Sequence, residues 1–328
     1  MKAIIVKKPG GPEQLQESEQ PKPEPHEGEL LIKVKSAAVN RSDIVNREGR
    51  SGYLKNPVLG IEVAGIVEKA GPGTEVKVGT SVMGLVNGGG YAEYAVMPAD
   101  RAMVIPEGLL FEEAAAISEV FLTAYQTLFW LGRLSKGETV LIHAGGSGVG
   151  TAAIQLAKQL VGATVITTAG SKEKLDFAQS LGADHCINYK EQDFAEEVLR
   201  ATDGQGVDLI LDFIGASYWD KNMASIKVDG RWILIGVLGG AKIEEVSLRD
   251  LMSKRIQLTG TLLTPRSNQY KAELTADFAT NALNYFESKQ LKPIVDRVFA
   301  FEDIQQAHLH MEQNKNIGKI ILKVDSTS

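Results

Sequence analysis

The chain has 328 residues, of which 44% are hydrophobic and 23% charged, a composition typical of folded globular proteins. Its 35 Lys and Arg against 41 Asp and Glu give a formal net charge of −6, which disfavours nucleic acid as a partner. A single cysteine, Cys186, excludes a disulfide framework and a cysteine-rich zinc site. No apolar run has the length of a secretory signal or a membrane span, so we expect a cytoplasmic protein.

The first 121 residues contain short β-like runs that are separated by Gly and Pro turns. The expected strands are Lys2–Val6, Glu29–Val39, Ile61–Glu68 and Tyr91–Val96. Many short strands with such turns predict a small barrel or sandwich.

From about Thr139 to Thr261 strands alternate with helices. Apolar runs predict six strands, at Thr139–Ala144, Ala163–Thr168, His185–Asn188, Val207–Phe213, Arg231–Leu238 and Ile256–Thr261. Apolar residues at helical spacing follow the first strand, and Lys172–Leu181 predicts the next helix. Strands joined by helical crossovers indicate an α/β fold with a doubly wound parallel sheet of the Rossmann type.

After Pro265 this alternation stops. Helices are expected at Lys271–Ser288 and Phe301–Met311, with a terminal strand at Gly318–Val324. We therefore expect a β-rich domain over 1–121, a nucleotide-binding domain over 122–264, and a return segment over 265–328. The return segment is too small to form a domain, so it should pack on the first one.

A glycine-rich turn separates the first strand of the predicted sheet from its first helix. It consists of Gly145, Gly146, Ser147, Gly148, Val149 and Gly150. Small residues let the backbone approach a pyrophosphate closely, and a helix N-terminus offers it free N–H groups. Glycines also serve plain turns, but the preceding strand and following helix favour nucleotide binding. Ser147 is expected to hydrogen-bond the pyrophosphate or the nicotinamide ribose.

The end of the second strand indicates which nucleotide is bound. Sheets that bind NAD usually carry an acid there, whereas this chain has Gly170, Ser171 and then Lys174. A hydroxyl and an ammonium suit a 2′-phosphate, so we predict NADPH as the cofactor. The alternative is that Ser171 only caps the next helix and that the lysine is solvated.

The segments after the other strands are further candidates, because ligands of open α/β sheets lie outside the carboxyl ends of the strands. These residues are Ile214, Gly215 and Ser217 after the fourth strand, Gly236, Val237 and Leu238 at the end of the fifth, and Thr261, Leu262 and Leu263 after the sixth. His143 ends the first strand, and we expect a core role for it rather than a catalytic one.

Five segments resemble, in this chain order, the medium-chain dehydrogenase/reductase superfamily and its zinc-independent NADPH:quinone oxidoreductase (zeta-crystallin-like) family. They are Ala38–Asp43, Leu59–Gly65, Gly89–Tyr94, Ile142–Gly150 and Asn314–Lys319. The resemblance covers essentially the whole chain and implies a GroES-like catalytic domain before the Rossmann domain. Zinc-dependent members carry Cys where Asn40 stands and His where Ile61 stands, so no metal is expected.

The resemblance also implies further site residues. Asn40, Asp43 and Thr123 would line the substrate pocket near the nicotinamide, and Tyr53 would lie on the loop that covers it. A simpler interpretation is that Asn40 and Asp43 cap a helix. Tyr53 is spaced differently from the tyrosine of the family. Two more residues are implied near the cofactor, Tyr189 beside the adenosine phosphate and Asn316 in the closing segment.

The expected function is an NADPH-dependent quinone reductase. Without a Lewis acid to hold an alkoxide, alcohol oxidation is disfavoured, whereas a quinone takes hydride to give a delocalised hydroquinone anion. One alternative is an NADPH-dependent enone or enoyl-thioester (2-alkenal) reductase, which would benefit from a proton donor such as Tyr53. Another is an NADPH-binding regulatory or RNA-binding protein, which the net charge disfavours.

The last strand of the sheet, Ile256–Thr261, would be an exposed edge with apolar residues. Such edges are usually covered or paired. Proteins of the family that the chain resembles pair them across a two-fold axis, so the resemblance implies a homodimer through this strand.

Overall fold

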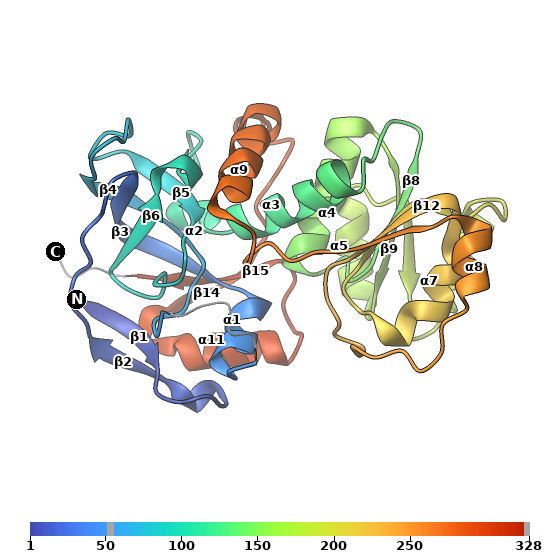
Figure 1. Cartoon of the computed structure of the whole chain (residues 1–328), viewed down its shortest axis with the longest axis horizontal. Helices are drawn as coiled ribbons and strands as arrows, with labels where there is room; N and C mark the ends of the chain where they lie inside the picture. Colours follow the sequence, from blue (N-terminus) through green and yellow to red (C-terminus); the bar gives the residue numbers. More distant parts are fainter. Residues whose placement is uncertain (51–55, 325–328) are drawn as a thin grey trace. The chain divides into compact units, whose positions relative to one another are not determined.

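The computed structural model describes residues 1–50 and 56–324, and the chain divides into two compact units (Figure 1). The first unit combines Met1–Leu122 with Thr264–Ser328, and the second is Thr123–Leu263. The sequence placed the two borders after residues 121 and 264.

The first unit is built on a seven-stranded sheet in the order β14-β15-β3-β4-β5-β7, with β6 also paired to β3. These strands are β3 (Glu29–Val39), β4 (Glu62–Ala70), β5 (Ser81–Leu85), β6 (Tyr94–Pro98), β7 (Met103–Val104), β14 (Val295–Ala300) and β15 (Lys319–Lys323). A separate antiparallel pair consists of β1 (Lys2–Val6) and β2 (Leu15–Glu19).

The return segment contributes directly to this sheet, because β15 pairs antiparallel with β3. The register sets Ile320 opposite Val39, so Lys319 arrives beside the end of β3. The helices of the unit are α1 (Arg41–Arg47), α2 (Phe111–Ala114), α9 (Asn268–Ala282), α10 (Asn284–Glu287) and α11 (Ile304–Glu312), while α3 (Ser118–Tyr125) runs across the border. Ile304 and Met311 of α11 join the same hydrophobic core as Ile320.

The second unit is a six-stranded parallel sheet in the order β10-β9-β8-β11-β12-β13, which confirms the Rossmann prediction. The strands are β8 (Thr139–Ile142), β9 (Thr164–Ala169), β10 (His185–Asn188), β11 (Val207–Asp212), β12 (Ile226–Leu234) and β13 (Gln257–Gly260). Its helices are α4 (Gly148–Val161), α5 (Lys172–Ser180), α6 (Phe194–Ala201), α7 (Trp219–Ser225) and α8 (Leu248–Lys254), preceded by a π-helix over Gln126–Leu131. Leu141, Ile166 and Trp232 lie in its core.

The fifth strand of the sheet differs from its prediction. It was expected over Arg231–Leu238, but β12 begins at Ile226 and ends at Leu234. The backbone N–H groups of Ile235 and Gly236 both donate to the Asp212 carbonyl, and that of Leu238 donates to the Phe213 carbonyl. The chain therefore leaves the ladder early, and Gly236–Leu238 form a loop instead of a strand end.

Candidate functional site

The glycine-rich turn joins β8 to α4 in the second unit. Ser147 is the N-cap of α4, and its Oγ accepts a hydrogen bond from the Gly150 N–H at 3.0 Å. Ala144 has a φ of 53°, in the left-handed region that non-glycine residues rarely adopt. The turn thus places the N-terminus of a 14-residue helix at the carboxyl edge of the sheet, where its N–H groups can bind an anion.

The glycines of this turn are required by close packing. A Cβ on Gly150 would lie 2.3 Å from the Ala144 carbonyl oxygen, and one on Gly145 would lie 2.2 Å from Oγ1 of Thr167. A Cβ on Gly146 would meet the side chain of Lys174 at 2.9 Å. The Lys174 stem therefore lies over the turn. A bare backbone, a helix N-terminus and a nearby ammonium fit the phosphates of a dinucleotide.

The end of β9 carries the residues predicted to select the nucleotide. Ser171 is the N-cap of α5, so the capping interpretation is correct for its acceptor role. Tyr189 is 43% exposed, and its hydroxyl would lie 2.6 Å from a Cβ on Gly170. Gly170, Ser171, Lys174 and Tyr189 are therefore gathered around the end of one strand, which bears no carboxylate of its own.

His143 is a core residue, as expected. It is fully buried, its Nδ1 lies 2.9 Å from Thr168 Oγ1, and its Nε2 lies 2.7 Å from Asn222 Oδ1. Asn222 presents an acceptor here, because its Nδ2 donates to Asp212 at 3.2 Å, so His143 carries its proton on Nε2. Burial lowers the pKa of His143. A neutral ring with both nitrogens engaged does not serve as a base.

Asp212, which ends β11, was not among the predicted site residues. Its Oδ1 accepts from the N–H groups of Ile214 and Gly215 at 2.7 and 3.0 Å, and its Oδ2 accepts from the Trp232 indole at 3.1 Å. Asp212 thereby holds the turn that the sequence assigned to the cofactor. The signal for it was an acid that directly follows the apolar run Leu209–Leu211 at the end of the strand.

The loops after the later strands pack on one another at this edge. The Gly239 N–H donates to Ile214, and a Cβ on Gly215 would lie 3.3 Å from Val237. A Cβ on Gly239 would lie 2.1 Å from the Ser217 hydroxyl. After β13, Thr261 donates its N–H to Leu234, while Leu262 is 47% exposed and Leu263 is buried. The structure brings the predicted loop segments after β11 and β12 together.

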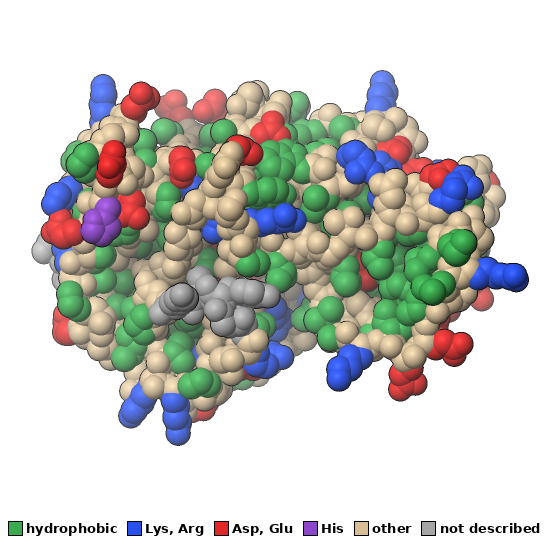
Figure 2. Space-filling view, viewed as in Figure 1, with side chains coloured by type: hydrophobic (Ala, Val, Ile, Leu, Met, Phe, Trp, Pro, Cys, Tyr) green, Lys and Arg blue, Asp and Glu red, His purple; other side chains and the backbone are tan. Residues whose placement is uncertain are grey.

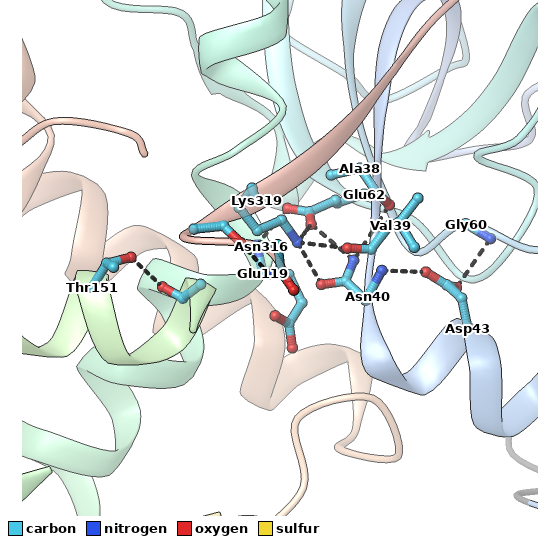
Figure 3. A network of polar contacts seen from close by, with 12 residues as sticks. Ala38, Val39, Asn40, Asp43, Gly60, Glu62, Glu119, Thr151, Asn316 and Lys319 are labelled. Atoms are coloured by element: carbon cyan, nitrogen blue, oxygen red, sulfur yellow. Dashed lines mark hydrogen bonds and ion pairs between the residues drawn. The ribbon is translucent and has the colours of Figure 1, made fainter. Parts of the chain in front are cut away.

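The first unit contains a buried polar network at the start of α1 (Figure 3). Asn40 and Asp43 form a capping box, in which Asp43 Oδ2 accepts from the Asn40 backbone N–H at 2.9 Å. The Asn40 side chain contacts Glu62 of β4 and Lys319 of β15. The capping interpretation therefore holds, and contact of these two residues with substrate stays a prediction.

Asp43 is fully buried and accepts three hydrogen bonds. Besides Asn40, the Tyr91 hydroxyl donates to it at 2.9 Å and the Gly60 N–H at 3.3 Å. Burial raises the pKa of Asp43 to about 6, although these donors and Lys319 lower it. Asp43 thus holds the N-terminus of α1 as an acceptor.

His308 continues this chain of polar groups from α11. Its Nε2 lies 3.4 Å from the Tyr91 hydroxyl, and its Nδ1 lies 3.2 Å from Nη1 of Arg47. Arg47 can only donate, so Nδ1 accepts and Nε2 carries the proton. Burial, together with the Arg47 charge, lowers the pKa of His308 to about 3. Arg47 is itself paired with Glu312 at 2.5 Å.

The remaining predicted site residues are Thr123, Asn316 and Tyr53, of which Asn316 lies beside Lys319 (Figure 3). Thr123 is buried on α3, and its carbonyl accepts from the Thr127 hydroxyl at 2.8 Å. Asn316 donates to the Gly318 carbonyl at 2.8 Å, which shapes the turn before β15. Tyr53 falls in the segment 51–55, outside the described residues.

In residues 1–50 and 56–324, no three His, Cys, Asp or Glu side chains are grouped so as to hold a metal ion. Cys186 is half-buried, and burial raises the pKa of its thiol to about 11.

Glu62, Tyr91 and Lys319 stand in the segments that resemble the family, but no role was predicted for them. The sequence signal that could have identified Glu62 and Lys319 was a charged residue within an apolar strand. Glu62 lies within Leu59–Gly65, and Lys319 precedes Ile320 and Ile321. A buried carboxylate and a buried ammonium each need a partner of opposite charge, so the two residues could have been expected to pair.

Comparison with known proteins supports this organisation. Residues 26–107 match a family model described as alcohol dehydrogenase GroES-like domain, and residues 148–280 match one described as zinc-binding dehydrogenase. The synaptic vesicle membrane protein VAT-1 homolog-like of Mus musculus is 32% identical over 346 residues, covering 100% of this chain and 82% of that protein. The quinone oxidoreductase of Rattus norvegicus is 32% identical over 330 residues, covering 98% of this chain and 97% of that protein.

Although one relative is named a membrane protein, no helix within the described ranges combines the length and apolarity needed to cross a bilayer.

Solved structures resemble the whole chain as well. The Escherichia coli quinone oxidoreductase complexed with NADPH has a TM-score of 0.90 at 30% identity, covering 99% of this chain and 100% of that one. An NAD-dependent alcohol dehydrogenase has a TM-score of 0.89 at 33% identity, with coverage of 99% and 100%. The JamJ enoyl reductase has a TM-score of 0.86 at 28% identity, with coverage of 98% of both chains.

Proposed function

Since the chain belongs to the medium-chain dehydrogenase/reductase superfamily and to its quinone oxidoreductase family, we propose that this oxidoreductase is an NADPH-dependent quinone reductase. The observation that carries the proposal is the edge of the second unit. A glycine turn in which a Cβ on Gly145 or Gly150 would clash lies there beside Lys174, with Ser171 and Tyr189 at the end of the next strand. A site of this kind suits a dinucleotide with a 2′-phosphate, as does the similarity to an NADPH complex.

The residues of the chain would bind and orient the reactants. The turn Gly145–Gly150 would hold the pyrophosphate, while Ser171, Lys174 and Tyr189 would surround the 2′-phosphate. When bound, NADPH supplies a hydride, and the reaction balances with one NADPH and one proton consumed for each quinone converted to hydroquinone. The loop segments Ile214–Ser217 and Gly236–Leu238 would border the cofactor, and Thr261–Leu263 and Asn316 are further proposed contacts. Asn40, Asp43 and Thr123 belong to the proposed substrate pocket, with Tyr53 as its covering residue.

The neutral, engaged state of His143 agrees with this chemistry. A quinone needs no strong acid or base from the protein, because the hydroquinone anion is delocalised and takes its proton from water. An enone behaves differently, since hydride addition leaves an enolate whose carbon must be protonated. The similarity to the JamJ enoyl reductase makes reduction of a 2-alkenal or enoyl thioester the second candidate.

One assay separates these candidates. NADPH consumption would be followed with an ortho-quinone and, in parallel, with a trans-2-enal, with NADH as the cofactor control. We expect turnover of the quinone with NADPH. Preference for the enal would move the protein to the ene-reductase class. Tight NADPH binding with neither substrate consumed would favour the regulatory interpretation.

We also propose that the protein is cytoplasmic and a homodimer. The lone cysteine, protonated and half-buried, suits a reducing compartment. The edge strand β13 carries the exposed apolar side chain of Leu258, which favours pairing of this strand with a second copy.

A further inference from the structure

The Glu62 carboxylate is the central acceptor of the buried network in the first unit (Figure 3). Its Oε1 accepts from Lys319 Nζ at 2.7 Å and from Asn40 Nδ2 at 2.9 Å. Its Oε2 accepts from the Glu119 backbone N–H at 2.7 Å, at the start of α3. The side chains of Glu62 and Lys319 are 0% and 4% exposed, so neither charge is compensated by bulk water. One carboxylate therefore links the end of β3, the start of α3 and β15.

This arrangement fixes the orientation of the Asn40 amide. Lys319 Nζ lies 2.6 Å from Asn40 Oδ1 and 3.3 Å from the Val39 carbonyl. An ammonium has donors only, so the atom that faces it must be the amide oxygen, and the NH₂ group must face Glu62. A flipped amide would set NH₂ against NH₃⁺ and oxygen against carboxylate. The ion pair thus selects one of the two amide orientations.

The NH₂ group of Asn40 has a donor to spare for a ligand. One N–H satisfies Glu62, whereas the other donates only a long hydrogen bond of 3.5 Å to the Ala38 carbonyl, which a ligand oxygen could replace. The charge-assisted bond from Lys319 to Oδ1 also polarises the amide and makes its N–H groups stronger donors. Asn40 keeps 5% of its surface exposed, while Asp43 next to it keeps none.

Building on the proposed function, we propose that Lys319 and Glu62 are positioning residues that hold Asn40 as an N–H donor to the carbonyl oxygen of the substrate. That oxygen gains negative charge when a quinone or enone receives hydride, and a fixed donor stabilises the charge as it develops. The substrate class is therefore a conjugated carbonyl compound. A buried ion pair is seldom retained for stability alone, because an apolar pair of similar volume often serves as well.

The test is a thermodynamic cycle between the ion pair and Asn40. The doubly substituted Glu62→Gln/Lys319→Met protein carries no unpaired buried charge, so it should fold, which circular dichroism would check. With a quinone we expect kcat to fall about 100-fold, with KM and the Kd for NADPH within about twofold of wild type. Asn40→Ala should cause a similar loss. Adding the pair substitutions to Asn40→Ala should cause no further loss, because the pair acts through Asn40.

A matched control distinguishes positioning from the general loss of an ion pair. Arg231 and Glu138 form a largely buried pair at 2.5 Å in the second unit, with side chains that are 11% and 25% exposed. The Glu138→Gln/Arg231→Met protein should keep the kcat of wild type. Lys319→Arg keeps the charge and the donors, so it should retain more activity than Lys319→Met. The inference is wrong if the Glu138→Gln/Arg231→Met protein loses as much kcat as the Glu62→Gln/Lys319→Met protein. It is also wrong if the Glu62→Gln/Lys319→Met substitutions lower kcat in the Asn40→Ala protein by the same factor as in wild type.

A second readout does not require turnover. 4-Nitrophenolate mimics the hydroquinone anion, and a hydrogen bond to its oxygen shifts its absorption to shorter wavelength. We expect 4-nitrophenolate bound to wild type to absorb at a shorter wavelength than 4-nitrophenolate bound to Asn40→Ala or to the Glu62→Gln/Lys319→Met protein. If wild type reduces neither quinone nor enal but gives the Asn40-dependent shift, the proposed function fails and the positioning inference stands. An unshifted or Asn40-independent spectrum overturns the inference even where quinone is reduced.

Discussion

The ammonium of Lys319 lies 2.6 Å from Oδ1 of Asn40, although 279 positions separate the two residues in the chain. Their contact follows from the antiparallel register of β15 on β3, which sets Ile320 opposite Val39. The final strand thus brings Lys319 to a polar network that includes Asn40 and Glu62 from the first part of the chain. Removing that strand's lysine therefore tests the whole network.

Loss of Lys319 alone should be more destabilising than loss of the pair. Lys319→Met leaves the Glu62 carboxylate buried without a cation, which typically costs about 3–5 kcal/mol. The Glu62→Gln/Lys319→Met protein removes both charges and should recover most of that loss. Urea denaturation followed by circular dichroism measures the difference. A double variant that is no more stable than Lys319→Met would mean that packing, rather than charge, dominates at this position.

Lys174 should discriminate NADPH from NADH. Its stem lies over Gly146, and its ammonium would form a charge-assisted contact with a 2′-phosphate. We expect Lys174→Ala to weaken NADPH binding by about 1–3 kcal/mol and to leave NADH binding nearly unchanged. Lys172→Ala is the matched control, since Lys172 lies on the same helix but pairs with the exposed Asp176 at 2.6 Å. Equal losses for the two cofactors would place Lys174 away from the phosphate.

The glycine turn should not tolerate a methyl group. In Gly150→Ala the new Cβ would lie 2.3 Å from the Ala144 carbonyl, so α4 would have to move away from the turn. Overpacking of this kind costs about 1–3 kcal/mol, and we expect NADPH affinity to fall with it. Gly260→Ala is the control, because its Cβ would meet nothing within 4 Å and its φ is not left-handed.

Ser147→Val should also weaken NADPH binding, because it removes the N-cap acceptor of Gly150. Unchanged affinity in both site variants, measured by NADPH fluorescence, would remove the turn from the cofactor site.

The parallel sheet could be predicted from sequence because its strands are continuous apolar runs buried on both faces. Leu141 and Ile166, for example, are fully buried in adjacent strands. A local signal also located one cap, since Ser171 precedes its helix as expected, whereas the capping role of Ser147 was not predicted. The end of β12 was misplaced because the apolar run continues past Leu234, whereas backbone hydrogen bonds to Asp212 and Phe213 turn the chain away.

The network of the first unit could not be predicted in the same way. Asp43 contacts Tyr91, and Tyr91 contacts His308, over separations of 48 and 217 residues. Periodicity reports which face of an element is buried but not which distant side chain it meets. The partners of Asn40 depend on the register of β15 on β3, which arises only when the return segment packs.

Asp43 and His308 should affect stability with opposite pH dependence. The pKa of Asp43 is raised to about 6 from 3.8, so the folded state binds the extra proton between these values. The protonated Asp43 contributes roughly 3 kcal/mol to the free energy of unfolding below about pH 4, and this contribution is lost as the pH rises through 6. Unfolding free energies of wild type and Asp43→Asn, measured from pH 4 to 7, should show wild type losing stability relative to the variant as pH rises. A constant difference would mean that Asp43 is ionised throughout.

For His308 the sign is reversed. Its pKa is lowered from 6.5 to about 3, so the unfolded state binds more protons between these values. The contribution of His308 is present above pH 6.5 and is lost as the pH falls toward 3. His308→Gln should therefore lose less stability than wild type on acidification from pH 7 to 4. If acidification destabilises both proteins equally, the pKa of His308 is the same in the folded and the unfolded state.

The edge strand β13 should pair with a second copy of the chain. Leu258 on this strand is 41% exposed and Met252 on α8 is 76% exposed, and hydrophobic side chains gather on the face of the second unit around α8 (Figure 2). An open apolar edge of this kind is normally covered, and a two-fold axis would cover it on both copies. We expect light scattering to give twice the chain mass of 35.4 kDa at micromolar concentration.

Leu258→Lys should shift the measured mass to that of the monomer, since the substitution would bury a lysine charge in the interface on each copy of the chain. Val78→Lys introduces the same charge at a residue of the first unit that is 62% exposed, and it should leave the dimer intact. A wild-type mass near 35.4 kDa across the micromolar range would contradict the dimer.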